Sequence, residues 1–509
     1  MAKRIHSTIA QAGVVCLLLI SLLVAYDLFS GREYFDIAYK PFRTLSSPHT
    51  FTLPSSSSSS SSSNLTSKEA SIELTLDSGK PDTTEAAHGA APHNEENQTN
   101  TAVTSPAIAP SHTPLPPIST PTPTPPPVPS SDVGGGASST VPDANPEHLK
   151  NAPLYIASIL DPDNKSLPRL DCPRPDISRY QYLKPGTTLK KPKFFIALNI
   201  REKADLLPRL LGSIVEALHF LGPENCVLSI VEGNSGDGTY EILHLLRPEI
   251  EKLGTEYHFS RSDLDPGAGD RIPKLAELRN MALAPLVSGG PGKYAADAVV
   301  LFLNDVAICL EDILELAHQR LYLGADMTCG FDWTYVGPDP TFYDVWISRT
   351  IAGDSFFEIP PDGNWNSAWN IFWNEDTSRR RFFDHKPLQV FSCWNGAVAM
   401  TARPLLDRLV SFRAPGPGEC FQGEPQLFCK DLWNAGFGKI AVVPSVNLEY
   451  SDEAGRKIKA AKGYTSQWVG GEDEVQDFRV DWKADPPEKV KCMASYDKQT
   501  WEPWNQAPE

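Results

Sequence analysis

A short apolar run that ends in an amide and a carboxylate constrains this chain more than any other stretch. Residues 298–303 are all apolar, and Asn304 and Asp305 follow directly. The run is too short to span a membrane, and apolar residues resume at helical spacing over residues 313–317. The pattern predicts a buried strand, a loop and then a helix that returns across the sheet.

The polar end of this strand is a candidate metal site. Ligands of open α/β sheets bind at the carboxyl ends of the strands. A carboxylate at that edge can hold a divalent cation and, through it, a diphosphate. We therefore predict Asp305 and Asn304 as metal ligands. The alternative is that these two residues only turn the chain and cap the next helix.

Strand and helix patterns alternate on the amino-terminal side of this run. Apolar strands are expected near residues 193–198, 226–231 and 257–260, and amphipathic helices near residues 206–218, 242–250 and 275–282. Because each crossover must return to the same edge, this order predicts an α/β fold with a largely parallel sheet. The chain lacks Gly-x-Gly-x-x-Gly after the first strand and any Gly-Lys-Ser/Thr loop, so neither a dinucleotide nor a P-loop nucleotide is indicated.

The chain before residue 151 has the pattern of a membrane anchor and a spacer. Residues 1–8 are predicted to be a cytoplasmic tail and the apolar residues 9–26 a signal-anchor helix, with a cleaved signal peptide as the alternative. Residues 27–150 are rich in Ser, Thr and Pro and predict a disordered luminal stem. A catalytic domain over residues 151–475 and a C-terminal extension over residues 476–509 complete the predicted organisation.

Composition favours a secretory protein. Glycosylation sequons occur at Asn64, Asn97 and Asn164, and eight of the nine cysteines lie beyond the predicted anchor. These features predict a single-pass type II membrane protein whose domain faces a lumen. Spacing does not give the disulfide pairing, and Cys309 could equally be a buried thiol. The net charge of −17 argues against nucleic acid as a partner.

An acidic loop over residues 232–239 follows the second predicted strand. Its sequence, Glu-Gly-Asn-Ser-Gly-Asp-Gly-Thr, resembles the loop of inverting processive glycosyltransferases in which acids contact the base and ribose of a nucleotide-sugar. Basic residues near the helix at 275–282 resemble the groups that reach a diphosphate in that fold. An ordinary turn and a solvated basic face are the alternatives. The predicted donor-binding residues are Asn199, Arg201, Glu232, Asn234, Asp237, Arg271, Lys274 and Arg279.

Tryptophans in the second half suggest a sugar site. Trp365, Trp369 and Trp373 recur every fourth residue, and an asparagine follows each of them. On a helix they would form neighbouring aromatic and amide stripes, which suit the apolar face and hydroxyl rim of a pyranose. Packing in the core is the alternative. The predicted acceptor-binding residues are Trp365, Trp369, Trp394 and Asn395.

Several ordered motifs over residues 191–450 together resemble one known family. They are Phe302-Leu303-Asn304-Asp305-Val306, Gly330-Phe331-Asp332-Trp333, Phe342-Tyr343-Asp344-Val345-Trp346 with Arg349, Cys393-Trp394-Asn395-Gly396, and Glu419-Cys420 with Glu424 and Asp431-Leu432-Trp433. The chain is similar to the fungal glycosyltransferase family 69, the cryptococcal α-1,3-mannosyltransferase and capsule-associated protein family. The resemblance implies a GT-A fold, a GDP-mannose donor, a divalent cation such as Mn²⁺, retention of configuration and a place in the Golgi membrane.

Three acids beside apolar or aromatic neighbours are the predicted catalytic residues: Asp332, Asp344 and Glu424. An inverting route would need a base on the acceptor hydroxyl. A retaining route could let the departing phosphate take that proton, so no nucleophile need be identifiable. We predict Glu424 as the acid nearest the reacting hydroxyl. The alternative is that Glu424 and Pro425 start a helix over residues 427–435.

Three functions compete at this stage. The first is mannosyl transfer from GDP-mannose to a mannose-containing glycan, in α-1,3 linkage, within a Golgi glycosyltransferase complex. The second is a non-catalytic glycan-binding or scaffolding member of a capsule or cell-wall polysaccharide assembly complex, because Asn304 stands where the fold has a carboxylate. The third is a glycoside hydrolase with Asp332 and Glu424 as paired acids, which the nucleotide-type first half disfavours.

Overall fold

The structure, a computed structural model, describes residues 144–184, 186, 191–469 and 479–506. The predicted tail and anchor, and Asn64 and Asn97, lie outside the described residues. Within these ranges, no helix combines the length and apolar character needed to cross a membrane. The strands of the main sheet are β1 Phe194–Ile200, β2 Cys226–Glu232, β3 Glu256–Arg261, β4 Val299–Leu303, β5 Met327–Val336, β6 Asp339–Phe342, β7 Arg349–Thr350, β8 Leu388–Ser392, β9 Ala397–Thr401 and β10 Ile440–Leu448.

The described strands form a ten-stranded sheet in the order β3-β2-β1-β4-β9-β5-β10-β8-β7, with β6 paired to β5. The first four strands are parallel, as the sequence predicts. Beyond them the sheet is mixed, because β9 runs antiparallel to both β4 and β5 while β5 and β10 are parallel. The late strand β9 therefore joins the two halves of the sheet.

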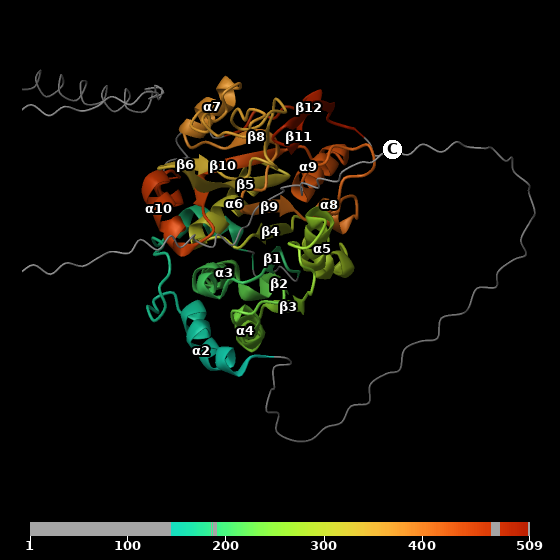
Figure 1. Ribbon diagram of the computed structural model, residues 1–509. Coiled ribbons are helices and arrows are strands. Elements are labelled where there is room, and N and C mark those ends of the chain that lie inside the picture. The colour runs from blue at the N-terminus through green and yellow to red at the C-terminus, as the bar shows by residue number, and fades with distance from the viewer. Residues whose placement is uncertain (1–143, 185, 187–190, 470–478, 507–509) are drawn as a thin grey trace, which may run out of the picture. The chain divides into compact units, whose positions relative to one another are not determined.

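Helices cover both faces of this sheet (Figure 1). They are α2 Pro146–Leu160, α3 Leu207–Leu221, α4 Thr239–Leu253, α5 Arg271–Gly289, α6 Leu310–Tyr322, α7 Asp376–Phe383, α8 Arg403–Leu406, α9 Glu424–Asn434 and α10 Asp452–Lys462. The 3₁₀ turns are η1 Ile177–Leu183, η2 Ala204–Leu206, η3 Pro223–Asn225 and η4 Thr465–Gln467. Figure 1 shows α2, α3 and α4 beside the β1–β3 end, and α7 at the β8 end.

Burial on both faces explains why β4 is apolar throughout. Val300 and Phe302 lie in one core with α5 and α9, whereas Val299, Leu301 and Leu303 lie in the other core with α3 and α6. A strand covered on both sides favours apolar residues at every position. Full burial of one such side chain contributes about 1.5–3 kcal/mol to stability.

The ordered domain begins earlier than the predicted boundary at residue 150. Helix α2 starts at Pro146 and is capped by Asn145, whose side chain accepts a hydrogen bond from the Glu147 N–H at 3.0 Å. The Asn145 N–H also donates to Glu241 on α4 at 2.7 Å. Because α2 packs on α3 and α4, the last residues assigned to the stem belong to the fold.

The end of the chain is built into the domain as well. The hairpin of β11 Lys489–Ser495 and β12 Lys498–Pro503 is joined to the body by the Cys420–Cys492 disulfide. The Lys491 N–H donates to the Gly353 carbonyl at 2.8 Å. At Gly353 the φ angle is +86°, and an added Cβ would lie 2.2 Å from the Lys489 carbonyl oxygen, so only glycine fits this close approach.

Two further disulfides lie in the described structure, Cys172–Cys309 and Cys329–Cys393, while Cys226 and Cys429 are buried thiols. The alternative that Cys309 is a free buried thiol is therefore wrong. The Cys172–Cys309 bond fastens the segment between α2 and β1 to the start of α6, the helix that follows β4.

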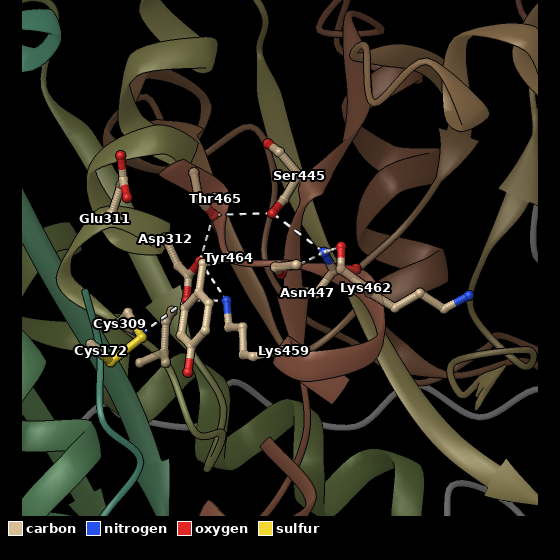
Figure 2. Close-up of polar contacts among 12 residues, drawn as sticks. Cys172, Cys309, Glu311, Asp312, Ser445, Asn447, Lys459, Lys462, Tyr464 and Thr465 are labelled. Carbon is tan, nitrogen blue, oxygen red and sulfur yellow. Dashed lines mark hydrogen bonds and ion pairs between the residues drawn. A yellow bond between two sulfur atoms is a disulfide. The ribbon is translucent and has the colours of Figure 1, made fainter. Parts of the chain in front are cut away.

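A buried ion pair lies next to this disulfide (Figure 2). Lys459 on α10 donates to both carboxylate oxygens of Asp312 on α6 at 2.7 Å, and both side chains are buried. Asp312 also accepts from the Cys309 N–H at 2.9 Å and from the Thr465 hydroxyl at 2.6 Å. Removing one partner of such a pair typically costs about 3–5 kcal/mol, so this cluster serves to hold α6, α10 and η4 together.

Candidate active site

The carboxyl ends of the parallel strands meet at one edge of the sheet. Ile200 at the end of β1 pairs with Glu232 at the end of β2, which pairs with Arg261 at the end of β3. Asn304 and Asp305 follow β4, which neighbours β1. The structure thus brings the predicted donor-binding and metal-binding segments to the edge at which ligands of α/β sheets bind.

The acidic loop is organised by its own carboxylates. Glu232 is fully buried, and its Oε1 accepts from the Ser235 N–H at 2.7 Å. Asp237 accepts from the Ala204 N–H at 2.8 Å and from the Thr239 N–H at 3.0 Å, so it fixes the start of α4 and the loop after β1 together. Asn234 has a φ of +57° and accepts from Arg261. The donor-binding role predicted for these residues remains a prediction.

Unused hydrogen-bonding capacity remains beside this loop. Oε2 of Glu232 is buried and has no hydrogen-bond partner, although the Arg261 guanidinium approaches it to 3.9 Å. Oδ1 of Asn199 is likewise buried without a partner. Because buried acceptors without a donor are uncommon and costly, these two atoms remain candidates for contact with a ligand.

Basic side chains are arranged around the loop that precedes α5. Arg201 forms an ion pair with Asp265 at 2.5 Å, and Lys274 donates to the Asp265 carbonyl at 3.0 Å. Arg271 begins α5, and its Nε is buried without a hydrogen-bond partner. Arg201 and Lys274 are thus positioned by contacts with Asp265, although the Arg201 side chain is 44% exposed. They give the edge the positive charge that a diphosphate needs.

Arg279 is the centre of the site. Its Nε donates to Glu424 at 2.9 Å, and both side chains are buried. The guanidinium carbon lies 4.5 Å from the centroid of the Trp394 ring, 5.4 Å from Phe302 and 5.6 Å from Phe412. Cation–π attraction of this kind is worth about 2 kcal/mol or more when desolvated. The alternative of a solvated basic face is therefore wrong for Arg279.

Asn304 and Asp305 have different environments. The amide oxygen of Asn304 accepts from the Trp394 indole at 3.0 Å and from Arg279 at 3.5 Å, so it is already engaged by two N–H donors and does not fit the predicted role of metal ligand. Asp305 forms an ion pair with Lys203 at 2.9 Å and is partly exposed. It is a carboxylate of this edge that a ligand can reach.

Within the described ranges no group of three or more His, Cys, Asp or Glu side chains is arranged to hold a metal ion. Mg²⁺ in nucleotide sites is commonly bound by only one or two carboxylates, with substrate phosphates and water as the other ligands. Asp305 fits that mode of binding as a single protein ligand, and no closed protein cage is present among these residues.

Asp332, within β5, and Asp344, just after β6, form a buried acid pair. The Tyr450 hydroxyl donates to Oδ2 of Asp332 at 2.6 Å, and the Asn395 N–H donates to Oδ2 of Asp344 at 3.1 Å. Oδ1 of each acid is buried without a partner. Burial raises the pKa of Asp344 to about 7. Burial and the neighbouring Asp344 charge raise the pKa of Asp332 well above its usual range.

Trp394 and Asn395 lie behind the site rather than on its surface. Trp394 is 1% exposed and directs its indole N–H at Asn304. Asn395 has a φ of +52°, accepts from the Ser348 hydroxyl at 2.7 Å and donates to the Gly330 carbonyl at 2.9 Å. With these groups engaged inside the protein, direct acceptor binding does not fit either residue, and both act by positioning their neighbours.

The tryptophan-rich stretch is not a helix. Residues 361–374 form a series of turns, in which the Asn364 N–H donates to the Asp362 side chain and the Asn366 N–H to the Asn364 side chain. Such side-chain to backbone bonds compete with helix formation. The expected stripe is therefore wrong. Trp365 is partly buried and donates to the Tyr496 hydroxyl at 3.3 Å, whereas Trp369 is 61% exposed.

Glu424 begins α9, as the Glu-Pro pair predicts, and also lines a pocket with Arg271. The helix-start interpretation and the site interpretation are thus both compatible with its position.

Sequence reasoning did not identify Lys203, Tyr450 or Phe412 as site residues. Lys203 could have been found as the basic residue after β1, but Tyr450 and Phe412 have no local signal because distant strands bring them to the site.

Comparison with known proteins identifies the family of this chain. The model of the family described as "Cryptococcal mannosyltransferase 1" matches residues 193–431. The curated alpha-1,3-mannosyltransferase CMT1 of Cryptococcus neoformans is 34% identical over 378 residues, which cover 69% of this chain and 80% of the relative. The chain belongs to the cryptococcal mannosyltransferase family. The family predicted from the sequence motifs is thereby confirmed. In this cryptococcal mannosyltransferase family member, the residues matched by the family model run from β1 into α9 and leave Tyr450 outside.

Solved structures give weaker likenesses to this family member. TarS of S. aureus in complex with UDP is 17% identical, with 50% of this chain and 60% of that chain covered and a TM-score of 0.30. Mannosyltransferase PcManGT from Pyrobaculum calidifontis, in complex with GDP-Man and Mn²⁺, is 12% identical, with 62% and 68% covered and a TM-score of 0.30. The chain thus spans about 60% of the TarS structure. At this level, neither likeness identifies a ligand of this protein.

Proposed function

We propose that this protein transfers mannose from GDP-mannose to a mannose-containing glycan, in α-1,3 linkage and with retention of configuration. The proposal is supported by membership in a mannosyltransferase family and by the 34% identity to an alpha-1,3-mannosyltransferase. One structural observation carries it: Asp305, Lys203 and the Arg279–Glu424 pair lie together at the carboxyl edge of the sheet, beside the acidic loop.

A divalent cation, Mn²⁺ in our proposal, would be held by Asp305 and would neutralise the departing diphosphate. Around it the chain supplies its own charges. Lys203 pairs with Asp305 at 2.9 Å, and Arg271, the first residue of α5, lines a pocket together with Glu424. These cations hold the diphosphate in place and favour its departure.

The acceptor hydroxyl is placed beside Glu424. Arg279 holds this carboxylate at 2.9 Å and stacks on Trp394, so its orientation is fixed before the substrate binds. In a retaining reaction on one face of the sugar, the departing phosphate accepts the proton of the acceptor hydroxyl. Glu424 then orients that hydroxyl. Asp332 and Asp344 do not touch the substrate. Asp344 accepts from the Asn395 N–H and Asp332 accepts from the Tyr450 hydroxyl, so the two acids position these residues.

The deciding experiment is a screen of nucleotide-sugars with the full-length protein. Hydrolysis of GDP-mannose that requires Mn²⁺ is expected to exceed hydrolysis of UDP-sugars by at least about tenfold. A protein that binds mannosides but hydrolyses no nucleotide-sugar would instead be the non-catalytic glycan-binding member considered above. Hydrolysis of glycosides without any nucleotide would contradict both.

The cellular setting is part of the proposal. The Golgi membrane, a type II orientation and a glycosyltransferase complex are proposed from residues 9–26 and from the composition of the stem. Asn164 is the predicted sequon that lies in the described chain. Its Oδ1 accepts from the Ser166 N–H at 2.8 Å, at a partly exposed position. Protection of the catalytic domain from protease in sealed membrane vesicles would test the orientation.

A further inference from the structure

A pocket opens next to Glu424 and is built from segments far apart in the sequence. Its walls come from the start of α5, from Trp346 and Ile347, from residues 421–424 and from Met493 and Ala494 of β11. The enclosed space is small, about 40 Å³, and the rest of the pocket is open to solvent. A ligand bound here would rest on the side chains that line the pocket and would stay partly exposed to water.

The C-terminal hairpin is fixed firmly enough to serve as a wall. The Cys420–Cys492 disulfide ties it to the residue before Phe421, and Arg349 donates to the Lys491 carbonyl at 2.8 Å. With the Lys491 to Gly353 bond, three ties hold β11 against the body. The hairpin lies outside the residues 193–431 that the family model matches.

Two aromatic side chains give the pocket its chemistry. Trp346 packs on Tyr496 with ring centroids 4.7 Å apart, and Tyr496 in turn accepts from Trp365. Trp346 is therefore held rigidly by residues of the hairpin. Phe421 is 44% exposed at the pocket, and its side chain is an apolar surface with water on one side. Rigid aromatic faces suit the apolar face of a pyranose ring.

Polar groups complete the lining. Gln422 and Glu424 lie on the same loop, and Arg271 has a buried Nε without a hydrogen-bond partner. An amide, a carboxylate and an unused N–H can bond to the hydroxyl rim of a neutral sugar. A second diphosphate is disfavoured, because the pocket includes Glu424 and is mostly apolar.

We infer that this pocket is the subsite for a hexopyranose unit of the acceptor glycan, with Phe421 and Trp346 as its aromatic walls and the C-terminal hairpin as its outer boundary. The inference rests on the proposed function, since it takes Glu424 as the group beside the reacting hydroxyl. In this assignment Phe421 and Trp346 take the acceptor-binding role predicted for Trp394 and Asn395, which are buried. Trp365 lies behind the pocket and supports it.

The test is binding of an α-linked mannose disaccharide to the full-length protein in the absence of nucleotide. Saturation-transfer NMR and calorimetry measure this binding. Phe421→Ala is expected to weaken binding roughly 3- to 10-fold, the loss expected for one aromatic contact. Phe421→Trp should retain binding. Trp501→Ala is the matched control, since Trp501 is 46% exposed on the same hairpin but does not line the pocket.

Kinetics separate this inference from the proposed function. In the Phe421→Ala protein the KM for the acceptor should rise by the same factor as the dissociation constant of the disaccharide, whereas Trp501→Ala should leave both donor hydrolysis and the acceptor KM as in the wild type. Three results would overturn the inference. They are disaccharide binding that is unchanged in Phe421→Ala, binding that is lost equally in Trp501→Ala, and no binding to the wild type. A wild type that binds the disaccharide but hydrolyses no donor supports the pocket and contradicts the transferase.

Discussion

Arg279 illustrates how much of the site depends on single side chains. Its guanidinium bonds Glu424, approaches Asn304 and stacks on Trp394. A planar group with five donors can do all three, whereas the compact ammonium of lysine cannot. The same contacts explain why an asparagine stands before Asp305. An amide accepts from both Trp394 and Arg279, while a carboxylate at this position would compete with Glu424 for Arg279.

Two substitutions test the roles given to the site edge. Asp305→Ala and Glu424→Gln should each lower kcat/KM for mannosyl transfer at least about 100-fold, because the first removes the proposed cation ligand and the second the oriented carboxylate. Asp297→Asn provides the control, since Asp297 pairs with Lys193 at the opposite edge of the sheet. Near-normal transfer by a folded Asp305→Ala or Glu424→Gln protein would discard that residue's role.

The buried acids make stability depend on pH. The pKa of Asp344 is about 7 in the folded protein against an ordinary value of 3.8, so the folded state binds the proton more tightly than the unfolded chain. The free energy of unfolding should therefore fall as the pH rises from about 4 to about 7. Denaturant titrations of Asp344→Asn should show a shallower fall over that range.

Asp481→Asn, which alters an exposed carboxylate, should leave this slope as in the wild type. An identical slope in Asp344→Asn and the wild type would show that Asp344 does not carry the proton. Glu311, whose pKa burial and the charges of Asp312 and Glu315 raise to about 7, contributes with the same sign. Part of the slope should therefore remain in the variant.

At the scale of elements, the sequence predicted what local periodicity can encode. The strands and helices from β1 to α6 were expected near their observed places, because apolar residues recur at strand or helix spacing and both faces of the sheet are covered. The turns at residues 361–374 were not predicted. The Asp362 and Asn364 side chains accept hydrogen bonds from backbone N–H groups two residues on, and these bonds override the four-residue spacing of the tryptophans. The start of α2 was missed because its stabilising partner, Glu241, lies on a helix about 100 residues away.

The start of α2 can be measured directly. A protein that lacks residues 1–150 loses Asn145, the first turn of α2 and the bond to Glu241. It should unfold about 1–2 kcal/mol more easily than a protein that lacks only residues 1–143, which is the typical cost of losing a helix cap. Chemical denaturation of the two proteins side by side gives the difference. Equal stability would place α2 outside the cooperative unit.

At the scale of the whole molecule, disulfides fasten the peripheral segments to the sheet. Cys172–Cys309 ties the segment after α2 to α6, and Cys420–Cys492 ties the hairpin to the loop before α9. This organisation could be expected only in outline from the even number of cysteines beyond residue 26. The pairing depends on which strands are neighbours, and the same holds for Lys203 with Asp305 and Tyr450 with Asp332. Each of these contacts forms only when strands far apart in the sequence have come together.

Loss of the Cys172–Cys309 bond should destabilise the folded protein. The double variant Cys172→Ser/Cys309→Ser is expected to lower the free energy of unfolding by about 2–5 kcal/mol, the usual range for a native disulfide. Asp312 can still accept from the backbone N–H of residue 309. Cys226→Ser removes a buried thiol without breaking a bond and serves as the comparison. A double variant as stable as the wild type would contradict this role.

The position of β9 between β4 and β5 has a consequence for synthesis of the protein. Leu303 at the end of β4 pairs with Ala397 at the start of β9, so the partner of β4 leaves the ribosome roughly 100 residues later. At about 5–20 residues per second, the apolar edge of the first four strands stays unpaired for roughly 5–20 s. An open strand edge is a template for aggregation, so this edge is exposed to pairing with the wrong partner until β9 is synthesised and completes the sheet.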